Sequence, residues 1–243
     1  MRIFGLIGKD IDYSFSRKYF SEKFKKESID AEYRNFDIPS IKNFPEISQN
    51  NIASGFNVTI PYKETIIPYL DHLDAHAEKI KAVNTIKFEK DGSLCGYNTD
   101  YWGFMQSIKP HLGAHHKNAL ILGTGGASKA IAYALDLLDI QTEFVSRDPE
   151  NNQFSYSALT TNVLNSHTLI INCTPLGTSP NIEKYPNIPF EFLSEKHLVF
   201  DLIYNPSQTK LMQLAAEKGA KTINGLAMLE QQAEKSWQIW NSR

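Results

Sequence analysis

The sequence is short of several features that define whole classes of protein. Its 243 residues include two cysteines, Cys95 and Cys173, whose spacing matches no metal or redox motif, so we expect reduced thiols in a cytoplasmic protein. No apolar run approaches the roughly 20 residues of a membrane-spanning helix, and the first apolar run is too short for a signal peptide. With a net charge of −2, the chain lacks the basic excess typical of proteins that bind nucleic acid or anionic membranes.

Strand-like and helical patterns alternate along almost the whole chain. An apolar content of 42% and a charged content of 21% are ordinary for a globular protein that has one large domain or two small ones. The alternation predicts an α/β fold with largely parallel sheets. The expected strands are 3–8, 31–36, 55–59 and 83–88 in a first series, then 118–122, 142–146, 168–172, 198–202 and 221–223 in a second.

Other local signals predict helices, turns and loops. Ser16 can cap a helix that runs to about Glu27, and residues 63–70 and 101–108 also have helical patterns. Asp91-Gly92 predicts a hairpin turn between 83–89 and 93–97. Residues 148–156 and the proline-rich 178–189 have the composition of surface loops. The last helical stripe, which we expect to pack in a core, contains Leu226, Leu229, Ala233, Trp237 and Trp240.

The segment Gly55-Phe56-Asn57-Val58-Thr59-Ile60-Pro61-Tyr62-Lys63 combines a buried strand with polar side chains. Period-2 alternation places Asn57 and Thr59 on one face of the strand. Pro61 ends the strand, and Lys63 follows just beyond its end. An amide, a hydroxyl and an ammonium that converge there suit a small polyhydroxylated carboxylic acid, and the lysine can also move protons.

A glycine turn at residues 120–130 predicts a dinucleotide site. Gly123 permits a tight turn after the strand, Gly125 lets a pyrophosphate approach the backbone, and Gly126 and Ala127 allow close packing of the helix that follows. The helix N-terminus presents unpaired N–H groups to the phosphates. The next strand ends at Ser146-Arg147-Asp148, where the Arg147 guanidinium suits the 2′-phosphate of NADP.

The segment Asn98-Thr99-Asp100 has two interpretations. Asn, Thr and Asp are common helix caps, and a helical pattern follows at once. Considered together with Lys63 and Asn84, the same residues are candidates for a catalytic site, because Asp100 can orient Lys63 and keep it charged.

The chain resembles shikimate dehydrogenases over nearly its full length. The motifs that carry the resemblance are, in order, Ser14-Phe15-Ser16, 55–63, Ala82-Val83-Asn84-Thr85, Asn98-Thr99-Asp100, 123–127, Asn172-Cys173-Thr174-Pro175, 201–209 and 225–232. The resemblance implies a substrate domain of residues 1–101 and 227–243 and a Rossmann-type NADP(H) domain of residues 102–226, with a C-terminal helix that returns to the first domain. The reaction it implies is reversible, NADPH-dependent reduction of 3-dehydroshikimate to shikimate, on the route to chorismate and the aromatic amino acids.

The resemblance also implies roles for individual residues. Lys63 and Asp100 would form the catalytic pair. The substrate contacts would be Ser14, Ser16, Asn57, Thr59, Lys63, Asn84, Asp100, Tyr204 and Gln232. The cofactor contacts would be Gly123, Gly125, Gly126, Ala127, Ser146, Arg147, Asn172, Thr174, Gly225 and Met228. The chain is expected to act on a small molecule, as a monomer or a homodimer, with hinges near residues 100–103 and near Gly225.

The sequence departs from the family pattern in the segment 13–20, which lacks the Pro and His that usually surround the serines. Arg17 replaces the proline, and Arg17 or Tyr13 could take part in binding the substrate carboxylate. His72 and His76 could share a helix face, but no motif supplies further zinc ligands, and we expect no metal.

Two other functions are compatible with the same residues. The first is a quinate/shikimate dehydrogenase that uses NAD or both cofactors, since Asp148 next to Arg147 is an awkward neighbour for a phosphate. The second is a ligand sensor that kept the fold and lost turnover, although the chain has no fused DNA-binding element.

Overall fold

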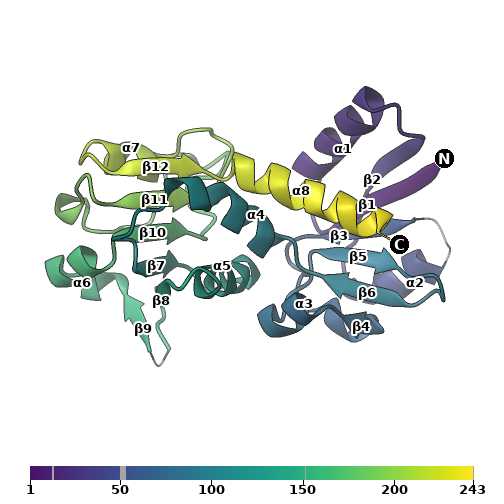
Figure 1. Ribbon diagram of the computed structural model, residues 1–243, viewed down its shortest axis with the longest axis horizontal. Coiled ribbons are helices and arrows are strands. Elements are labelled where there is room, and N and C mark those ends of the chain that lie inside the picture. The colour runs from purple at the N-terminus through teal and green to yellow at the C-terminus, as the bar shows by residue number, and fades with distance from the viewer. Residues whose placement is uncertain (13, 50–52, 151, 243) are drawn as a thin grey trace. The chain divides into compact units, whose positions relative to one another are not determined.

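The computed structural model describes residues 1–12, 14–49, 53–150 and 152–242. The chain forms two compact units: unit 1 is Met1–Trp102 together with the segment from Gln232 onward, and unit 2 is Gly103–Gln231. Each unit contains one six-stranded sheet flanked by helices (Figure 1). The predicted α/β fold with largely parallel sheets is confirmed.

Unit 1 is built on a mixed sheet. In chain order its elements are β1 (Arg2–Gly8), α1 (Phe15–Lys26), β2 (Ala31–Asp37), α2 (Phe44–Gln49), β3 (Gly55–Val58), β4 (His72–Leu73), α3 (Ala75–Ile80), β5 (Thr85–Phe88) and β6 (Leu94–Tyr97), with 3₁₀ turns at Ile41–Asn43 and Ile67–Tyr69. The strand order is β2-β1-β3-β5-β6-β4. β1 is parallel to β2 and β3, whereas β5 is antiparallel to both β3 and β6.

The reversal of β5 decides which polar residues meet. Asn57, near the end of β3, lies opposite Thr85, at the start of β5, and Thr85 lies opposite Tyr97, at the end of β6. The amide N–H of Val58 donates to the carbonyl of Asn84, which fixes this edge. The end of β3, the start of β5 and the end of β6 therefore lie side by side at the same end of these strands, and the polar motifs of the sequence gather there.

Both faces of this sheet carry an apolar cluster. On one face Phe56, Ile86 and Val83 pack with residues of the α2 and α3 region. On the other face Phe4, Phe20 and Phe24 pack with Ala233, Trp237 and Trp240 of α8 (Leu226–Asn241). The Trp240 indole N–H also donates to the carbonyl of Ile86, at 3.0 Å. The C-terminal helix packs on the first sheet, as expected, although Leu226 of the predicted stripe is 40% exposed.

Unit 2 is built on a fully parallel sheet of order β12-β11-β10-β7-β8-β9. Its elements are α4 (Asp100–Ile108, which begins in unit 1), β7 (Asn118–Leu122), α5 (Gly126–Asp136), β8 (Gln141–Ser146), β9 (Gln153–Ser155), α6 (Thr161–Ser166), β10 (Leu169–Asn172), β11 (Leu198–Asp201), α7 (Lys210–Ala216) and β12 (Lys221–Asn224), with 3₁₀ turns at Lys109–His111, Tyr156–Ala158 and Phe190–Phe192. The chain runs outward from β7 to β9 and then returns to β10 beside β7. Ligands of such sheets bind at the carboxyl ends of the strands, where the order reverses.

Three local predictions are wrong for identifiable reasons. The segment 63–70 forms turns and a 3₁₀ turn rather than a helix, because Pro68 has no amide hydrogen and blocks a continuous helix. Ser14, not Ser16, caps the first helix, and its hydroxyl accepts from the N–H of Arg17. The predicted loop 148–156 contains β9, which pairs with β8.

Two further expectations also change. His72 lies in β4 and His76 in α3, so the two histidines do not share a helix. Most of the segment 13–20 is the first part of α1, which begins at Phe15, and Tyr13 lies outside the described residues. None of the helices in the described part of the chain combines the length and hydropathy needed to cross a bilayer.

Candidate active site

Lys63 and Asp100 form a close ion pair in unit 1. The Lys63 Nζ lies 2.7 Å from Asp100 Oδ2, and the two side chains are only 17% and 8% exposed. The turn after β3 positions Lys63, whose carbonyl accepts from the N–H of Val83. Asp100 begins α4. This is the pair that the sequence predicted as catalytic, and the lysine remains open enough to meet a ligand.

Asn84 holds the carboxylate of the pair. Its side-chain NH₂ donates to Asp100 Oδ1 at 2.9 Å and to Thr99 Oγ1 at 3.0 Å. Its oxygen accepts from the Thr99 N–H at 2.7 Å and from the Thr85 hydroxyl at 3.1 Å. Because the oxygen is occupied by donors, the NH₂ group is directed toward Asp100.

Of the two interpretations of residues 98–100, the helix cap is confirmed for Asn98, and the catalytic role of Asp100 stays a prediction. Asn98 is the cap: its oxygen accepts from the N–H of Asp100 at 3.0 Å and of Tyr101 at 3.4 Å, at the start of α4. Its NH₂ donates to the carbonyl of Ala82 at 2.9 Å, which joins the two motifs. Asp100 is thereby left to pair with Lys63.

Asn57 is buried and its amide is used entirely within the protein. Its NH₂ lies 3.0 Å from Ser236 Oγ, 3.1 Å from Thr85 Oγ1 and 3.1 Å from the carbonyl of Asn84. Its oxygen accepts from the Tyr33 hydroxyl at 2.8 Å. Burial raises the pKa of Tyr33, and a hydrogen bond with Ser16 opposes that rise, so Tyr33 is a neutral donor. Asn57 therefore links strands to helix α8. Its predicted contact with a substrate stays a prediction.

The other predicted substrate residues of unit 1 surround this network. Thr59 follows β3 on the same face as Asn57, and its hydroxyl has no hydrogen-bond partner among the described residues. Gln232, which is 7% exposed, lies in α8 and accepts at Oε1 from Asn84 and Thr99, each at 3.3 Å. Ser14 and Ser16 lie at the start of α1. Tyr204, by contrast, belongs to unit 2.

The glycine turn of unit 2 has the shape that a pyrophosphate needs. Gly123 follows β7 with a φ of +99°, which favours glycine. Gly125 precedes α5, and no heavy atom lies within 4 Å of the position of an added Cβ. No side chain caps the N-terminus of this helix, so its N–H groups remain for a ligand. These residues fit the phosphates of a dinucleotide.

The loop after β10 lies beside this turn, at the point where the strand order reverses. The N–H of Cys173 donates to the carbonyl of Leu122 at 2.9 Å, and Thr174 approaches Gly123. Asn172 is fully buried and bonded to Asp201 and Thr174, so it anchors the loop. Burial raises the pKa of the Asp201 carboxyl, against the hydrogen bonds from Thr209, Ile203 and Asn172.

The remaining predicted cofactor residues also lie at carboxyl ends of strands in unit 2. Ser146 ends β8, where its hydroxyl closes a turn with the backbone of Asp148, and the exposed Arg147 comes between them. Gly225 follows β12, and an added Cβ there would lie 2.0 Å from the carbonyl oxygen of Leu202. Met228 is buried in the first turn of α8.

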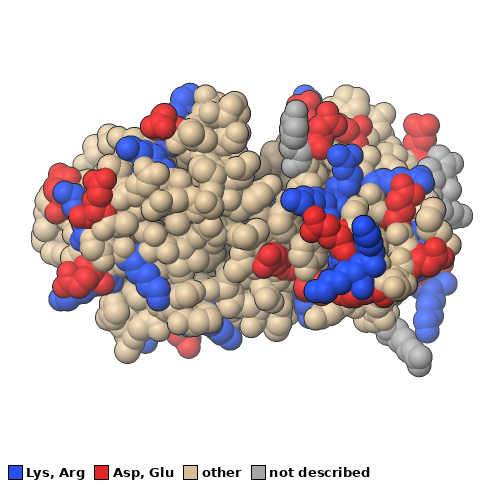
Figure 2. All heavy atoms as spheres, turned by 90° about the horizontal axis from the view of Figure 1, so that it is seen from above, with Lys and Arg blue, Asp and Glu red and all other residues tan. Residues whose placement is uncertain are grey.

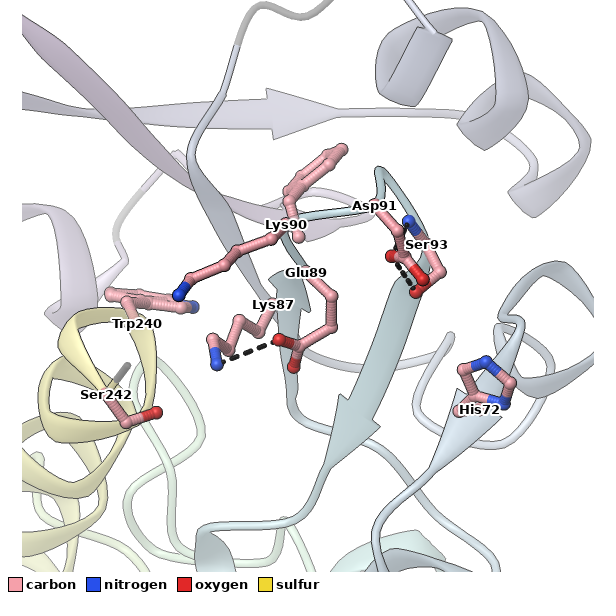
Figure 3. A pocket seen from close by; sticks show the side chains of 9 residues that line it. His72, Lys87, Glu89, Lys90, Asp91, Ser93, Trp240 and Ser242 are labelled. Carbon is pink, nitrogen blue, oxygen red and sulfur yellow. Dashed lines mark hydrogen bonds and ion pairs between the residues drawn. The ribbon is translucent and has the colours of Figure 1, made fainter.

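Two other surface features can be compared with this site among the described residues. On the face shown in Figure 2, described Lys and Arg side chains are mixed with Asp and Glu and form no patch of one sign. A groove at the turn of the β5–β6 hairpin is lined by His72, Lys90 and Trp240, and Lys87 is paired there with Glu89 (Figure 3). This groove lies at the turn end of the hairpin, away from Asn84. No cluster of metal-ligating side chains occurs among the described residues.

Comparisons with known proteins agree with this geometry. Residues 6–86 match the model of the shikimate dehydrogenase substrate binding domain. A relative from Methanosphaera stadtmanae named shikimate dehydrogenase (NADP(+)) is 39% identical, over 99% of this chain and 92% of the relative. The chain belongs to the shikimate dehydrogenase family. A relative of the same name from Clostridium botulinum is also 39% identical, over 97% of this chain and 95% of the relative.

Solved structures of the family share the whole fold. The shikimate dehydrogenase of Aquifex aeolicus is 33% identical with a TM-score of 0.89, covering 99% of this chain and 92% of that one. A shikimate dehydrogenase crystallised with NADP⁺ is 34% identical with a TM-score of 0.87, covering 99% of this chain and 90% of that one.

The structure adds polar residues that the sequence analysis gave no role. Thr85 and Thr99 bond to Asn84, and their signal was present, since both lie inside motifs that the analysis singled out. Ser236 follows Gln232 by one helical turn, a spacing that places both on one face of α8. Tyr33 gave no signal, because a lone tyrosine in a strand is usually a core residue.

Proposed function

We infer that this protein catalyses the reversible, NADPH-dependent reduction of 3-dehydroshikimate to shikimate, on the route to chorismate and the aromatic amino acids. The observation that carries the inference is the 2.7 Å pair of Lys63 and Asp100, held by Asn84, in a chain of the shikimate dehydrogenase family. The two groups provide an acid and its orienting partner at a partly open site, which is what reduction of a ketone requires.

We propose that the substrate binds on unit 1, which contains the pair and residues 6–86 that match the substrate binding domain. Thr59 supports this with an unpartnered hydroxyl, and Lys63 with a partly exposed ammonium. Ser14 and Ser16, at the first turn of α1, supply hydroxyl donors for the carboxylate. Asn84 and Gln232 present further polar groups next to Asp100.

The chain's own groups handle the proton of the reaction. Reduction of a ketone adds a hydride to carbon and develops negative charge on oxygen, and the Lys63 ammonium stabilises that charge and delivers a proton from Nζ. Asp100 holds the ammonium in place, and Asn84 holds Asp100. In the oxidative direction Lys63 removes the proton of the hydroxyl group. NADP(H), when bound, supplies or accepts the hydride.

We propose that unit 2 binds the dinucleotide, within the predicted range 102–226. The open glycine turn, Gly123 with Gly125, supports binding of the pyrophosphate, and the N–H groups of α5 complement its charge. Arg147 supports NADP over NAD because a guanidinium binds a 2′-phosphate through paired hydrogen bonds. The other proposed cofactor contacts are Gly126, Ala127, Ser146, Asn172, Thr174, Gly225 and Met228. Tyr204 of the same unit is a proposed substrate contact.

A spectrophotometric assay tests the function directly. We expect shikimate oxidation with NADP⁺ to be much faster than with NAD⁺, and faster than quinate oxidation with either cofactor. Equal or better rates with NAD⁺ or quinate would support the quinate/shikimate alternative instead. Tight binding of shikimate without turnover with either cofactor would support the sensor.

A variant of Arg147 tests the cofactor preference within the same assay. We expect Arg147→Gln to lower kcat/KM for NADPH by roughly one or two orders of magnitude, as expected for loss of a charge-assisted contact, and to leave the value for NADH nearly unchanged. An equal decrease with both cofactors would argue against a 2′-phosphate contact.

We further propose that the protein acts in the cytoplasm, as a monomer or a homodimer.

A further inference from the structure

Ser236 of α8 is fully buried and lies at the centre of a hydroxyl cluster. Its Oγ lies 2.8 Å from Thr85 Oγ1 and 3.2 Å from Thr99 Oγ1, and the two threonine hydroxyls lie 3.4 Å from each other. We call Thr85, Thr99 and Ser236 the hydroxyl cluster. Its three members come from β5, from the segment before α4 and from α8.

The hydroxyl cluster joins the two buried amides of the site. Ser236 Oγ accepts from the NH₂ of Asn57 at 3.0 Å and lies 3.0 Å from the carbonyl of Gln232, which shares its single hydrogen with Thr85. Thr85 and Thr99 bond to the side-chain oxygen of Asn84, at 3.1 and 3.2 Å. A hydroxyl has one hydrogen, so when Thr85 donates to Asn84 the 2.8 Å bond takes the hydrogen of Ser236. Ser236 thereby restricts how the threonine hydroxyls orient their hydrogens.

From the hydroxyl cluster, hydrogen bonds continue to the catalytic pair. The oxygen of Asn84 accepts from the Thr99 N–H at 2.7 Å and lies 3.1 and 3.2 Å from the two threonine hydroxyls. Its NH₂ therefore faces Asp100 Oδ1 at 2.9 Å, and Asp100 Oδ2 faces Lys63 at 2.7 Å. In buried networks each bond restricts the next, because an unsatisfied polar group is costly in a low-dielectric interior. The orientation of the carboxylate is therefore coupled to groups that do not touch it.

We propose that Ser236 is a positioning residue, which acts through Thr85, Thr99 and Asn84 to hold Asp100 and Lys63 in their reactive arrangement. The proposal rests on the function inferred above. Ser236 touches neither member of the pair, so its effect is expected on turnover more than on substrate binding. Misplacement of a catalytic group by an ångström or less is enough to slow an enzyme severely.

Removal of either hydroxyl of the 2.8 Å bond tests the proposal. We expect Ser236→Ala to lower kcat for shikimate oxidation about tenfold, with KM for shikimate changed by less than about threefold. Thr85→Val removes the hydroxyl at nearly constant volume and is expected to have a similar effect. Because both act on one bond, the double variant should lose little more than Thr85→Val alone. Thr85→Ser, which restores the hydroxyl, should recover most of the loss.

Ser107 offers a matched control. It is another buried serine on a helix, 8% exposed, and its hydroxyl donates to the carbonyl of Phe104 at 2.9 Å. Ser107→Ala removes an equivalent helix bond outside the network and should leave kcat and KM within about twofold of the parent. Comparison with it separates loss of a buried helix hydroxyl in general from loss of the hydroxyl cluster.

The outcomes separate the inference from the function on which it rests. A parent protein that does not oxidise shikimate with NADP⁺ refutes the function. An active parent whose Ser236→Ala variant keeps kcat within twofold, or changes KM alone, refutes the positioning role. A loss that scales with the unfolded fraction in a thermal melt also refutes it. If Ser236→Ala does not fold, Thr85→Val and Thr85→Ser decide the question in the same assay.

Discussion

Lys63 Nζ and Asp100 Oδ2 lie 2.7 Å apart although 37 residues separate them in the chain. The turn after β3 supplies the lysine and the start of α4 supplies the carboxylate, and Asn84 bonds to the other carboxylate oxygen. The ammonium is thus fixed by one partner, while 17% of the lysine side chain remains exposed. An acid held in this way suits proton transfer to a bound ketone.

The first prediction concerns Lys63. Lys63→Ala should lower turnover by roughly 10² to 10⁴, the usual contribution of a general acid–base group, while shikimate still binds. Steady-state rates and shikimate titration by calorimetry measure the two effects separately. Lys79→Ala, which changes an exposed lysine of α3, is the control and should leave both values unchanged. Unchanged turnover in Lys63→Ala would remove the lysine from the mechanism.

The second prediction separates two glycines of the same turn. At Gly125 an added Cβ meets no atom within 4 Å and φ is −76°, so Gly125→Ala should fold as stably as the parent. Because its methyl group occupies the approach of the pyrophosphate, NADPH should bind at least about tenfold more weakly. Fluorescence titration with NADPH and thermal melts measure binding and stability.

Gly123→Ala should behave in the opposite way. Gly123 has a φ of +99° and Thr174 lies 3.2 Å from the position of the new Cβ, so the substitution strains the fold itself. Its melting temperature should fall by several degrees, whereas that of Gly125→Ala should not. Equal NADPH affinity in Gly125→Ala and in the parent would mean that no phosphate approaches this glycine.

The third prediction concerns Tyr33, whose hydroxyl donates to the buried oxygen of Asn57 at 2.8 Å. Tyr33→Phe leaves that oxygen unsatisfied and should lower the free energy of unfolding by about 1–3 kcal/mol. Urea denaturation measures the change. Tyr69→Phe is the matched control, because no hydrogen bond of the Tyr69 hydroxyl is present among the described residues. Equal stabilities of the two variants would show that the buried bond contributes nothing.

The fourth prediction concerns pH. Burial lowers the pKa of His116 below its ordinary value of 6.5, and the charges of His115, His197 and Lys221 lower it further, against the favourable effect of the Lys196 backbone. Below pH 6.5, His116 therefore binds a proton in the unfolded chain while it is still neutral in the folded chain. The stability present above pH 6.5 should be lost progressively as the pH falls toward the folded-state pKa.

Urea midpoints between pH 7.5 and about 5 measure this dependence, which follows from the one-proton difference. His116→Asn keeps an oxygen that can accept from the N–H of Gly113, as His116 Nδ1 does at 2.8 Å, but it does not titrate. The variant should therefore show a shallower decrease than the parent. His72→Asn, a change at an exposed histidine of β4, is the control. The same slope in His116→Asn and the parent would exclude His116 as the source.

The sequence predicted the parts of this fold that depend on local pattern. Strands such as β7, with its unbroken apolar run, and the hairpin signal at Asp91-Gly92 were clear because their side-chain patterns extend over several residues. The prediction of a helix at 63–70 was wrong because Pro68, which has no amide hydrogen, interrupts an otherwise helical pattern. β9 was missed because it has only three residues, Gln153-Phe154-Ser155, which become a strand only by pairing with β8.

In the candidate site, too, some residues could be predicted from local motifs and others depend on contacts made only in the folded chain. Lys63, Asn84 and Asp100 were predicted because they lie in recognisable motifs. The bonds of Ser236 were not predictable from spacing, since its hydroxyl meets that of Thr85 from 151 residues away. Asn57 shows the converse: its position on the polar face of β3 was predicted, but only the folded neighbours reveal that Tyr33 and Ser236 occupy its amide.

The reversed strand β5 also has a practical consequence. Because Asn84 and Asn98 lie at one end of the β5–β6 hairpin, its turn lies at the other, about 13 Å away for strands of four residues. Gly92 in that turn has a φ of +88° and open space around it. A fluorophore or an affinity tag attached at this turn would therefore be carried by the sheet at the end opposite to Asn84 and Asn98.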